Sequence, residues 1–254
     1  MKCKLNGTEM RKKIESVLLK GKWNNGSNNK NTILCPSIII SVDDEQSNCK
    51  LTNGNPSTYV SNVIDTIDCN DSKSGRVSVD SEILLKYLPK EDCILHLEDN
   101  TLKVLSESKT VRIPVIERHE NNDSILFVEK NLIINRDMSK EVVVSPRTKL
   151  KTRIKVSTDD LVNALSDCEA VGNSVFQLDF DGNYLNISSS NGTELVMVKL
   201  EPMQTVGEKA CMEFSAPIHK YLDGRTTILS FEDETPVAIL SGNLRMLRAP
   251  RIEH

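Results

Sequence analysis

Apolar residues follow two different periods along the chain, and each period predicts a different kind of element. In residues 8–20 they recur at i, i+4, i+7 and i+8, which predicts an amphipathic helix whose other face is rich in lysine. Residues 158–168 repeat this spacing behind a serine or threonine that can cap a helix. We expect two shorter helices, at 81–88, where a proline follows, and at 216–222.

The remaining apolar residues form short runs that alternate with polar positions or are bounded by turn-forming clusters. Residues 38–42 and 59–64 are two such runs, and polar clusters rich in Asn, Gly and Ser separate them from their neighbours. Residues 93–97 and 101–105 are predicted to pair across a turn at 98–100. The pattern indicates an α+β fold in which helices pack on antiparallel sheets.

One segment of the chain occurs twice. Lys86-Tyr87-Leu88 recurs as Lys220-Tyr221-Leu222, and without a gap eight of the sixteen positions in 86–101 match those in 220–235. A repeat unit near 130 residues is a duplicated domain, because solenoid repeats span roughly 20 to 50 residues. We therefore predict an amino-terminal domain at 1–117, a connector at 118–151 and a carboxy-terminal domain at 152–254.

The connector holds more apolar material than a plain linker carries. It contains the runs 125–128, 132–134 and 142–144, separated by polar residues. Two interpretations stay open at this stage: a connector with a function of its own, or extra strands that belong to the flanking sheets.

Composition narrows the class of protein. The chain is 38% hydrophobic and 27% charged, with a formal net charge of -4, which is ordinary for a globular protein and does not exclude one basic face. The seven cysteines are widely spaced, so we expect reduced thiols, mostly buried. The four histidines are scattered and no phosphate-binding loop is present, so we expect no metal, no cofactor and no catalysis. Without an apolar run of roughly 18 residues or a signal peptide, we expect an intracellular protein that is not embedded in a membrane.

The carboxy-terminal segment Gly242–Glu253, Gly-Asn-Leu-Arg-Met-Leu-Arg-Ala-Pro-Arg-Ile-Glu, resembles the end of the proliferating cell nuclear antigen (PCNA) family of DNA sliding clamps. Pro236 also lies where that family has a proline in the preceding strand. The resemblance implies a homotrimeric ring of six similar domains around duplex DNA, which acts as a processivity factor in DNA replication and repair. It implies ring closure through edge strands at 110–116 and 195–201, and a location in the nucleus or nucleoid.

In that family, basic residues on the helices line the channel and attract DNA without reading its sequence. The resemblance assigns this role to Lys12, Lys13, Lys20, Lys86, Lys90, His219 and Lys220. The alternative is an ordinary solvated helix face. One departure from the family is the helix at 158–168, which exposes Asp159, Asp160 and Asp167 where basic residues are usual.

The family also binds short peptides of polymerase, clamp loader, flap nuclease and ligase in an apolar pocket between the connector and the tail. The corresponding residues here are Leu34, Ile38, Ile40, Ile125, Leu126, Phe127, Pro236, Ala249, Pro250, Arg251 and Ile252. The alternative is that these side chains belong to the core.

Two other functions remain open. The chain could be a specialised or checkpoint-type subunit of a heterotrimeric clamp, which would not close a ring alone. It could also be a peptide-binding scaffold of the same fold that never encircles DNA; the acidic helix favours this and the lysines of the first helix oppose it.

Overall fold

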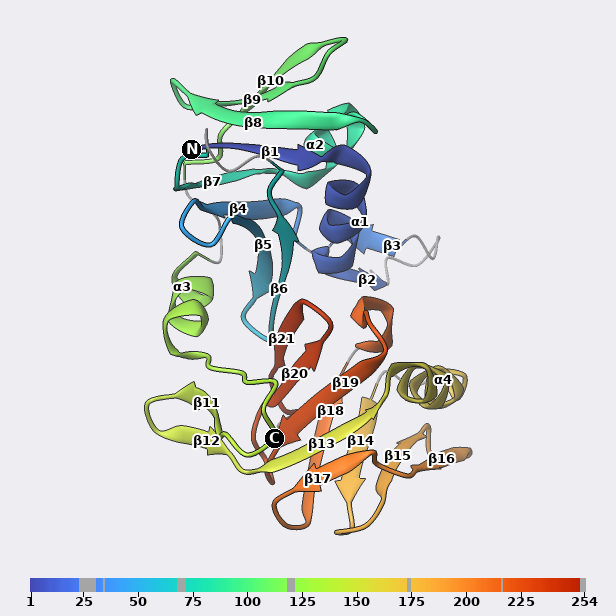
Figure 1. The fold of residues 1–254 in the computed structure, drawn as a ribbon. Coiled ribbons are helices and arrows are strands. Elements are labelled where there is room, and N and C mark those ends of the chain that lie inside the picture. Colours follow the sequence, from blue (N-terminus) through green and yellow to red (C-terminus); the bar gives the residue numbers. More distant parts are fainter. Residues whose placement is uncertain are drawn as a thin grey trace. The chain divides into compact units, whose positions relative to one another are not determined.

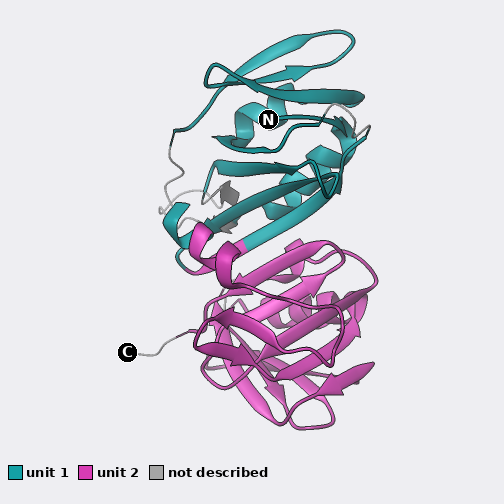
Figure 2. Ribbon diagram, turned by 60° about the vertical axis from the view of Figure 1, so that its left-hand side comes forward, with its two compact units in different colours: residues 1–56, 60–125 teal, residues 57–59, 126–254 magenta. Residues whose placement is uncertain are grey.

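The computed structural model describes residues 1–22, 31–33, 35–67, 72–117, 122–172, 175–215 and 217–251. The chain divides into two compact units (Figure 2): unit 1 comprises Met1–Pro56 and Val60–Ile125, and unit 2 comprises Ser57–Tyr59 and Leu126–His254. No helix within the described residues is long and apolar enough to span a membrane.

Unit 1 combines two helices with two sets of antiparallel strands (Figure 1). One sheet has the order β1-β8-β9-β10, and further strands follow the order β6-β5-β4-β7. The elements are β1 (Lys2–Asn6), α1 (Gly7–Val17), β2 (Lys20–Lys22), β3 (Asn31–Ile33), β4 (Ser37–Asp43), β5 (Asn48–Asn55), β6 (Thr58–Asp65), β7 (Gly75–Asp80), α2 (Ser81–Tyr87), β8 (Asp92–Glu98), β9 (Thr101–Leu105) and β10 (Thr110–Pro114).

Unit 2 repeats this arrangement. Its sheets contain the orders β13-β19-β20-β21 and β16-β15-β14-β18, and β17 is added beside β13. The elements are β13 (Thr152–Ser157), α4 (Thr158–Glu169), β14 (Val175–Phe180), β15 (Leu185–Ser190), β16 (Leu195–Leu200), β17 (Gln204–Val206), β18 (Ala210–Ser215), the 3-10 turn η2 (His219–Tyr221), β19 (Thr226–Phe231), β20 (Val237–Ser241) and β21 (Leu244–Arg248). The shared strand order confirms the duplication.

The long helix of each unit begins in the same way. In α1 the side chain of Asn6 accepts a hydrogen bond from the Glu9 amide, and in α4 Ser157 accepts one from the Asp160 amide. Each cap satisfies a backbone donor that the first helical turn leaves without a partner. Both caps directly follow a strand, so the strand-to-helix junction is encoded locally in both copies.

The first helix is shorter than predicted. It ends at Val17, and the next residue, Leu18, is extended and buried. Lys20 therefore lies in β2, which pairs with β3, and not on the helix as the sequence suggested. The apolar spacing predicted a longer helix because a buried leucine fits the helical spacing whether its own backbone is helical or extended.

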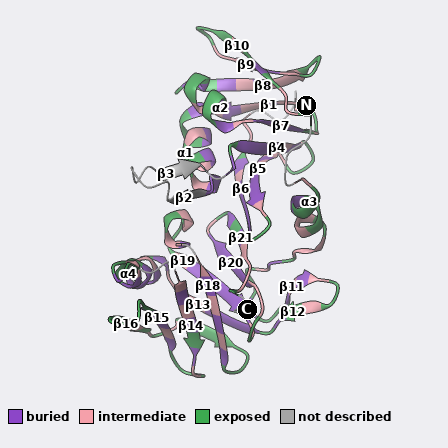
Figure 3. Cartoon of the chain, turned by 180° about the vertical axis from the view of Figure 1, so that it is seen from behind, coloured by how far each residue is buried: buried purple, intermediate pink, exposed green. Residues whose placement is uncertain are grey.

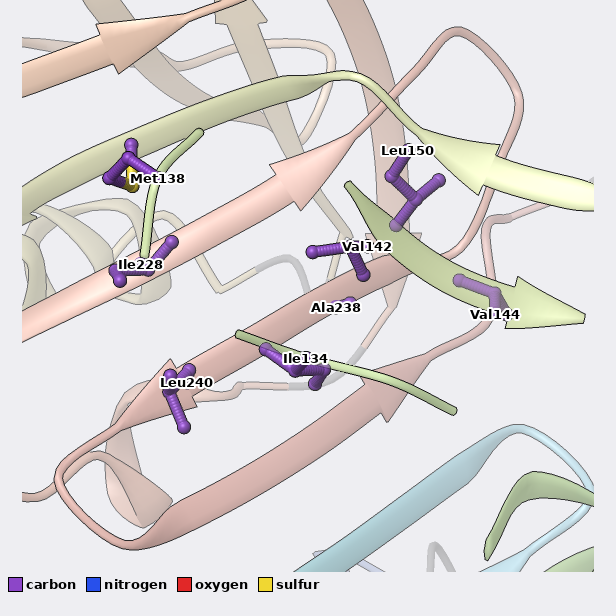
Figure 4. Packing of buried hydrophobic residues seen from close by; sticks show 8 residues of the cluster. All are labelled: Ile134, Met138, Val142, Val144, Leu150, Ile228, Ala238 and Leu240. Atoms are coloured by element: carbon purple, nitrogen blue, oxygen red, sulfur yellow. The ribbon is translucent and has the colours of Figure 1, made fainter. Parts of the chain in front are cut away.

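The connector begins with α3 (Asn122–Asn131) and continues into the hairpin of β11 (Val142–Ser145) and β12 (Thr148–Leu150). Side chains between residues 132 and 150 form one hydrophobic cluster with side chains of β19 and β20 in unit 2 (Figure 4). The cluster comprises Ile134, Met138, Val142, Val144, Leu150, Ile228, Ala238 and Leu240. The sequence left open that the apolar runs are extra strands of the flanking sheets. Run 142–144 is a strand, β11, but it pairs with β12 in a separate two-stranded sheet, and run 125–128 is helical.

The thiol prediction is confirmed for the described cysteines. Six are free, of which five are buried and Cys211 is half-buried, while Cys69 lies outside the described residues. Burial raises the pKa of Cys93 to about 12, so this thiol stays protonated and unreactive near neutral pH.

Candidate nucleic-acid and partner interfaces

The helices of unit 1 present lysines to solvent. Lys12 on α1, Lys86 on α2 and Lys90 after α2 are exposed, and Lys13 is half-buried. Two contacts tie α1 to the end of α2: the Arg11 guanidinium donates to the Leu88 carbonyl (2.9 Å), and Thr8 Oγ1 donates to the Lys90 carbonyl (2.8 Å). These contacts hold together α1, α2 and the residues that follow α2, which carry four of the predicted DNA-facing residues. The side chain of Lys20 is outside the described part of the chain.

The helical surface of unit 2 has the opposite charge. Asp159, Asp160 and Asp167 of α4 are exposed. Glu169 lies 2.9 Å from Lys220 Nζ and 3.3 Å from His219 Nε2, so it neutralises the lysine of the predicted pair.

The environment of His219 favours its neutral form. Its side chain is only 8% exposed, and this desolvation lowers its pKa even though Glu169 acts in the opposite direction. Its Nδ1 atom is buried and has no hydrogen-bond partner. Near neutral pH, His219 therefore adds no positive charge to this surface.

The two helical surfaces can do different chemistry. Lysines at the surface attract phosphates through salt-screened Coulomb forces, whereas carboxylates repel them. The surface of unit 1 suits a phosphate backbone, and the acidic face of α4 does not.

Each unit also ends a sheet in an exposed strand. Among the described strands, β10 pairs only with β9 and β16 pairs only with β15. Leu195 and Met197 of β16 are 65% and 62% exposed. An open strand edge with apolar side chains is a template for pairing with another chain. The two edges match the positions that the family resemblance assigned to ring closure.

The predicted partner-binding residues fall into three groups. Leu126 and Phe127 on α3 are 42% and 55% exposed, whereas their neighbour Ile125 is buried. In unit 1, Ile38 and Ile40 of β4 are completely buried, so their side chains belong to the core. Leu34 and Ile252 lie outside the described residues.

The third group is the tail of unit 2. Pro236, Ala249 and Pro250 are half-buried, and Arg251 is exposed. The Arg251 amide donates to the Glu213 carbonyl (2.8 Å), which fixes the tail beside β18. Figure 3 shows that exposed and half-buried residues continue along α3. Within unit 2, the tail and α3 thus supply accessible apolar groups, as a peptide-binding surface needs.

Sequence reasoning missed the residues that hold the connector. Arg153 of β13 is 1% exposed, and its guanidinium donates to the carbonyls of Asn135, Asp137 and Lys140. Arg136 donates to the Gly242 carbonyl (3.1 Å) and to Asn243 Oδ1 (3.0 Å). No clear sign of this burial is visible in the sequence, because an arginine in a strand of alternating polar and apolar residues is expected on the exposed face and is rarely buried.

Comparison with known proteins identifies the fold. No family model and no curated protein sequence matches the chain. Among solved structures, the PCNA of A. fulgidus bound to the C-terminal region of FEN-1 aligns with a TM-score of 0.69 and 15% identity, covering 100% of this chain and 99% of that one.

Bacterial clamps align equally well. The Bacillus subtilis DNA polymerase sliding clamp has a TM-score of 0.72 at 15% identity, and the Helicobacter pylori beta clamp bound to a DNA ligase peptide has 0.69 at 14%. Both alignments cover 100% of this chain, which spans only 65% and 67% of those proteins. The chain has the sliding-clamp fold, as its carboxy-terminal segment suggested.

Proposed function

We propose that the chain is a DNA polymerase sliding clamp that closes into a homotrimeric ring around duplex DNA. The observation that carries the proposal is that the chain has a duplicated sliding-clamp fold and that its strands β10 and β16 both end a sheet in an open edge. Three chains joined through these edges give a closed ring, which leaves neither edge exposed. A ring of this kind tethers enzymes to DNA topologically and catalyses no reaction itself.

The proposed DNA contacts come chiefly from the helices of unit 1. Lys12, Lys13, Lys86 and Lys90 would attract phosphates without reading bases, so the clamp could slide. Lys220 would contribute less because Glu169 neutralises it.

The proposed partners are replication and repair enzymes that carry a short apolar peptide motif. Leu126 and Phe127 on α3, together with Pro236, Ala249 and Pro250, would receive the apolar side chains of such a motif. Polymerase, clamp loader, flap nuclease and ligase are the expected classes. Two of the similar clamps are bound to such segments, the H. pylori beta clamp to a DNA ligase peptide and the A. fulgidus PCNA to the C-terminal region of FEN-1.

The decisive test is ring formation followed by loading. Light scattering of the full chain should give about three times its 28.4 kDa mass, and the loaded protein should be retained on circular DNA but slide off linear DNA. The variant Lys12→Glu/Lys13→Glu/Lys86→Glu should remain trimeric and lose polymerase stimulation. The variant Lys140→Glu/Arg147→Glu/Lys209→Glu, which has the same net charge, should keep it. A monomer in solution would refute the homotrimer.

A specialised subunit of a heterotrimeric ring is the second candidate. The acidic face of α4 favours it, because three copies of Asp159, Asp160 and Asp167 around one DNA duplex would repel the phosphates. In that case the chain alone would be monomeric and would form a ring only with basic partner subunits.

A further inference from the structure

The outward face of the sheet β1-β8-β9-β10 in unit 1 carries a straight row of basic side chains. In the strand register, Lys2 lies opposite His96, His96 opposite Lys103, and Lys103 opposite Arg112. Lys73 extends the row, because its backbone exchanges two hydrogen bonds with Lys2, at 2.8 and 3.0 Å. Neighbouring strands lie about 4.8 Å apart, so the basic row from Lys73 to Arg112 is roughly 19 Å long.

The alternation of the strands places this row on the solvent side. Most of the residues that alternate with it are buried: Cys3, Leu5, Cys93, Leu95, Leu102, Val104 and Ile113. Leu97 and Val111, near the strand ends, are half-buried. Since directly paired residues share a face, the five side chains of the row emerge together on the opposite side. Lys73 and Arg112 at its two ends are exposed.

Acidic groups offset part of the row. Glu98 forms an ion pair with Lys103, and Asp92 lies 3.9 Å from Lys4 on the same face. The pKa of His96 is lowered, first by desolvation and then by the positive charges of Lys103, Lys2, the amino terminus and Lys73. Near neutral pH His96 is therefore uncharged, and the like charges that lie directly opposite each other are Lys2 with Lys73 and Lys103 with Arg112, pairs of a kind that destabilise a sheet.

We propose that the basic row is a second nucleic-acid surface, which binds the phosphate backbone of duplex DNA on the outside of the sheet. It is separate from the helices that the proposed function uses, and it does not require ring closure. Binding of a polyanion relieves the repulsion along the row and releases counterions.

The chemistry of the face favours nucleic acid over an acidic protein. Protein interfaces need a buried apolar centre, and within the described residues no strongly exposed large hydrophobic side chain comes from β1, β8, β9 or β10. The row also has no Phe, Tyr or Trp on which an unpaired base could stack, so single-stranded DNA gains no advantage. Contacts limited to the backbone position the protein without reading sequence.

The test uses the full chain and a closed circular duplex plasmid without a clamp loader. A closed ring cannot be threaded onto such DNA, so the channel lysines contribute little, and any binding reports an outside surface. If Lys2, Lys73 and Arg112 each neutralise one phosphate, the logarithm of the binding constant should fall with a slope of about -2.7 against log salt. That slope means roughly 40-fold weaker binding at 200 mM than at 50 mM salt.

The test variant is Lys2→Glu/Arg112→Glu, and its control is Lys130→Glu/Lys209→Glu, which changes the net charge equally on exposed residues of unit 2. The row variant should bind the plasmid at least about tenfold more weakly with a shallower salt slope, and the control should bind like the parent chain. If reversal at Lys2 disturbs folding, Lys73→Gln/Arg112→Gln changes only the two exposed ends and should still weaken binding severalfold.

Two results would overturn the proposal. One is plasmid binding by the row variants that equals the control. The other is displacement of the plasmid by polyglutamate at equal charge concentration, which would identify an acidic protein as the ligand class. Failure of ring formation appears in light scattering, whereas failure of this proposal appears as equal plasmid binding by the row variant and its control, so the two failures give different results.

Discussion

Replacing Arg153 with alanine should release the connector from unit 2. The guanidinium is buried and donates to three backbone carbonyls, those of Asn135, Asp137 and Lys140. Alanine would leave these three acceptors without their donor and would leave a cavity where the buried guanidinium lies. The local structure should therefore open more often while the rest of unit 2 stays folded.

The size of the effect follows from two opposing contributions. Hydrogen bonds that involve a charged group stabilise by about 1.5 to 3 kcal/mol each, so three give roughly 4 to 9 kcal/mol. Burying the guanidinium costs several kcal/mol, and desolvation accordingly lowers the pKa of Arg153. We expect a net loss of about 2 to 4 kcal/mol in the opening free energy of the connector.

Hydrogen exchange measures this loss directly. The Ile133 amide donates to the Val143 carbonyl (2.8 Å) and the Val143 amide donates to the Ile133 carbonyl (3.1 Å), so both amides report the attachment of the connector. In Arg153→Ala their exchange should accelerate roughly 30- to 700-fold, since 1.4 kcal/mol corresponds to tenfold. Arg147→Ala, at an exposed turn position, is the matched control. Unchanged exchange of both amides in Arg153→Ala would refute the role of this arginine.

Three further changes test the packing and the charges. Gly7→Ala should lower the free energy of unfolding by about 1 to 3 kcal/mol, measured by urea unfolding, because an added Cβ would lie 2.1 Å from the Pro89 carbonyl oxygen. Leu150→Ala should cost about 2 to 5 kcal/mol in urea unfolding, because it empties a fully buried site in the connector cluster. Burial lowers the pKa of His219 although Glu169 acts in the opposite direction, so the unfolded chain protonates this histidine more readily than the folded chain does. The free energy of unfolding should therefore fall as pH drops through the ordinary histidine pKa of about 6.5. In His219→Gln, the urea midpoint measured against pH should lose this component.

The sequence by itself determined the duplication, the positions of the main helices and the fold class. These features are local or nearly local: Asn6 and Ser157 cap their helices through residues three positions away, and the repeat at 86–101 and 220–235 is visible by direct comparison. The carboxy-terminal segment indicated the clamp fold because Ala249-Pro250-Arg251 and the preceding strand carry a residue pattern of their own.

Other assignments could not be made from the sequence. A run of four apolar residues such as 125–128 fits a helix or a strand equally well, and only the packing of Ile125 decides for α3. The apolar side chains of Ile38 and Ile40 are compatible with the wall of a peptide pocket or with the core, and their complete burial places them in the core.

Only the tertiary structure revealed the buried Arg153 and the basic row. Arg153 meets carbonyls 13 to 18 residues away. The row joins Lys2, His96 and Arg112 from separate strands with Lys73, which bridges to Lys2 from outside the strands. No spacing along the chain predicts such contacts, because strand order and register fix which residues lie opposite each other. The periodicity of a single helix or strand can be read from the sequence, whereas charged side chains from different elements come close together only when the sheet forms.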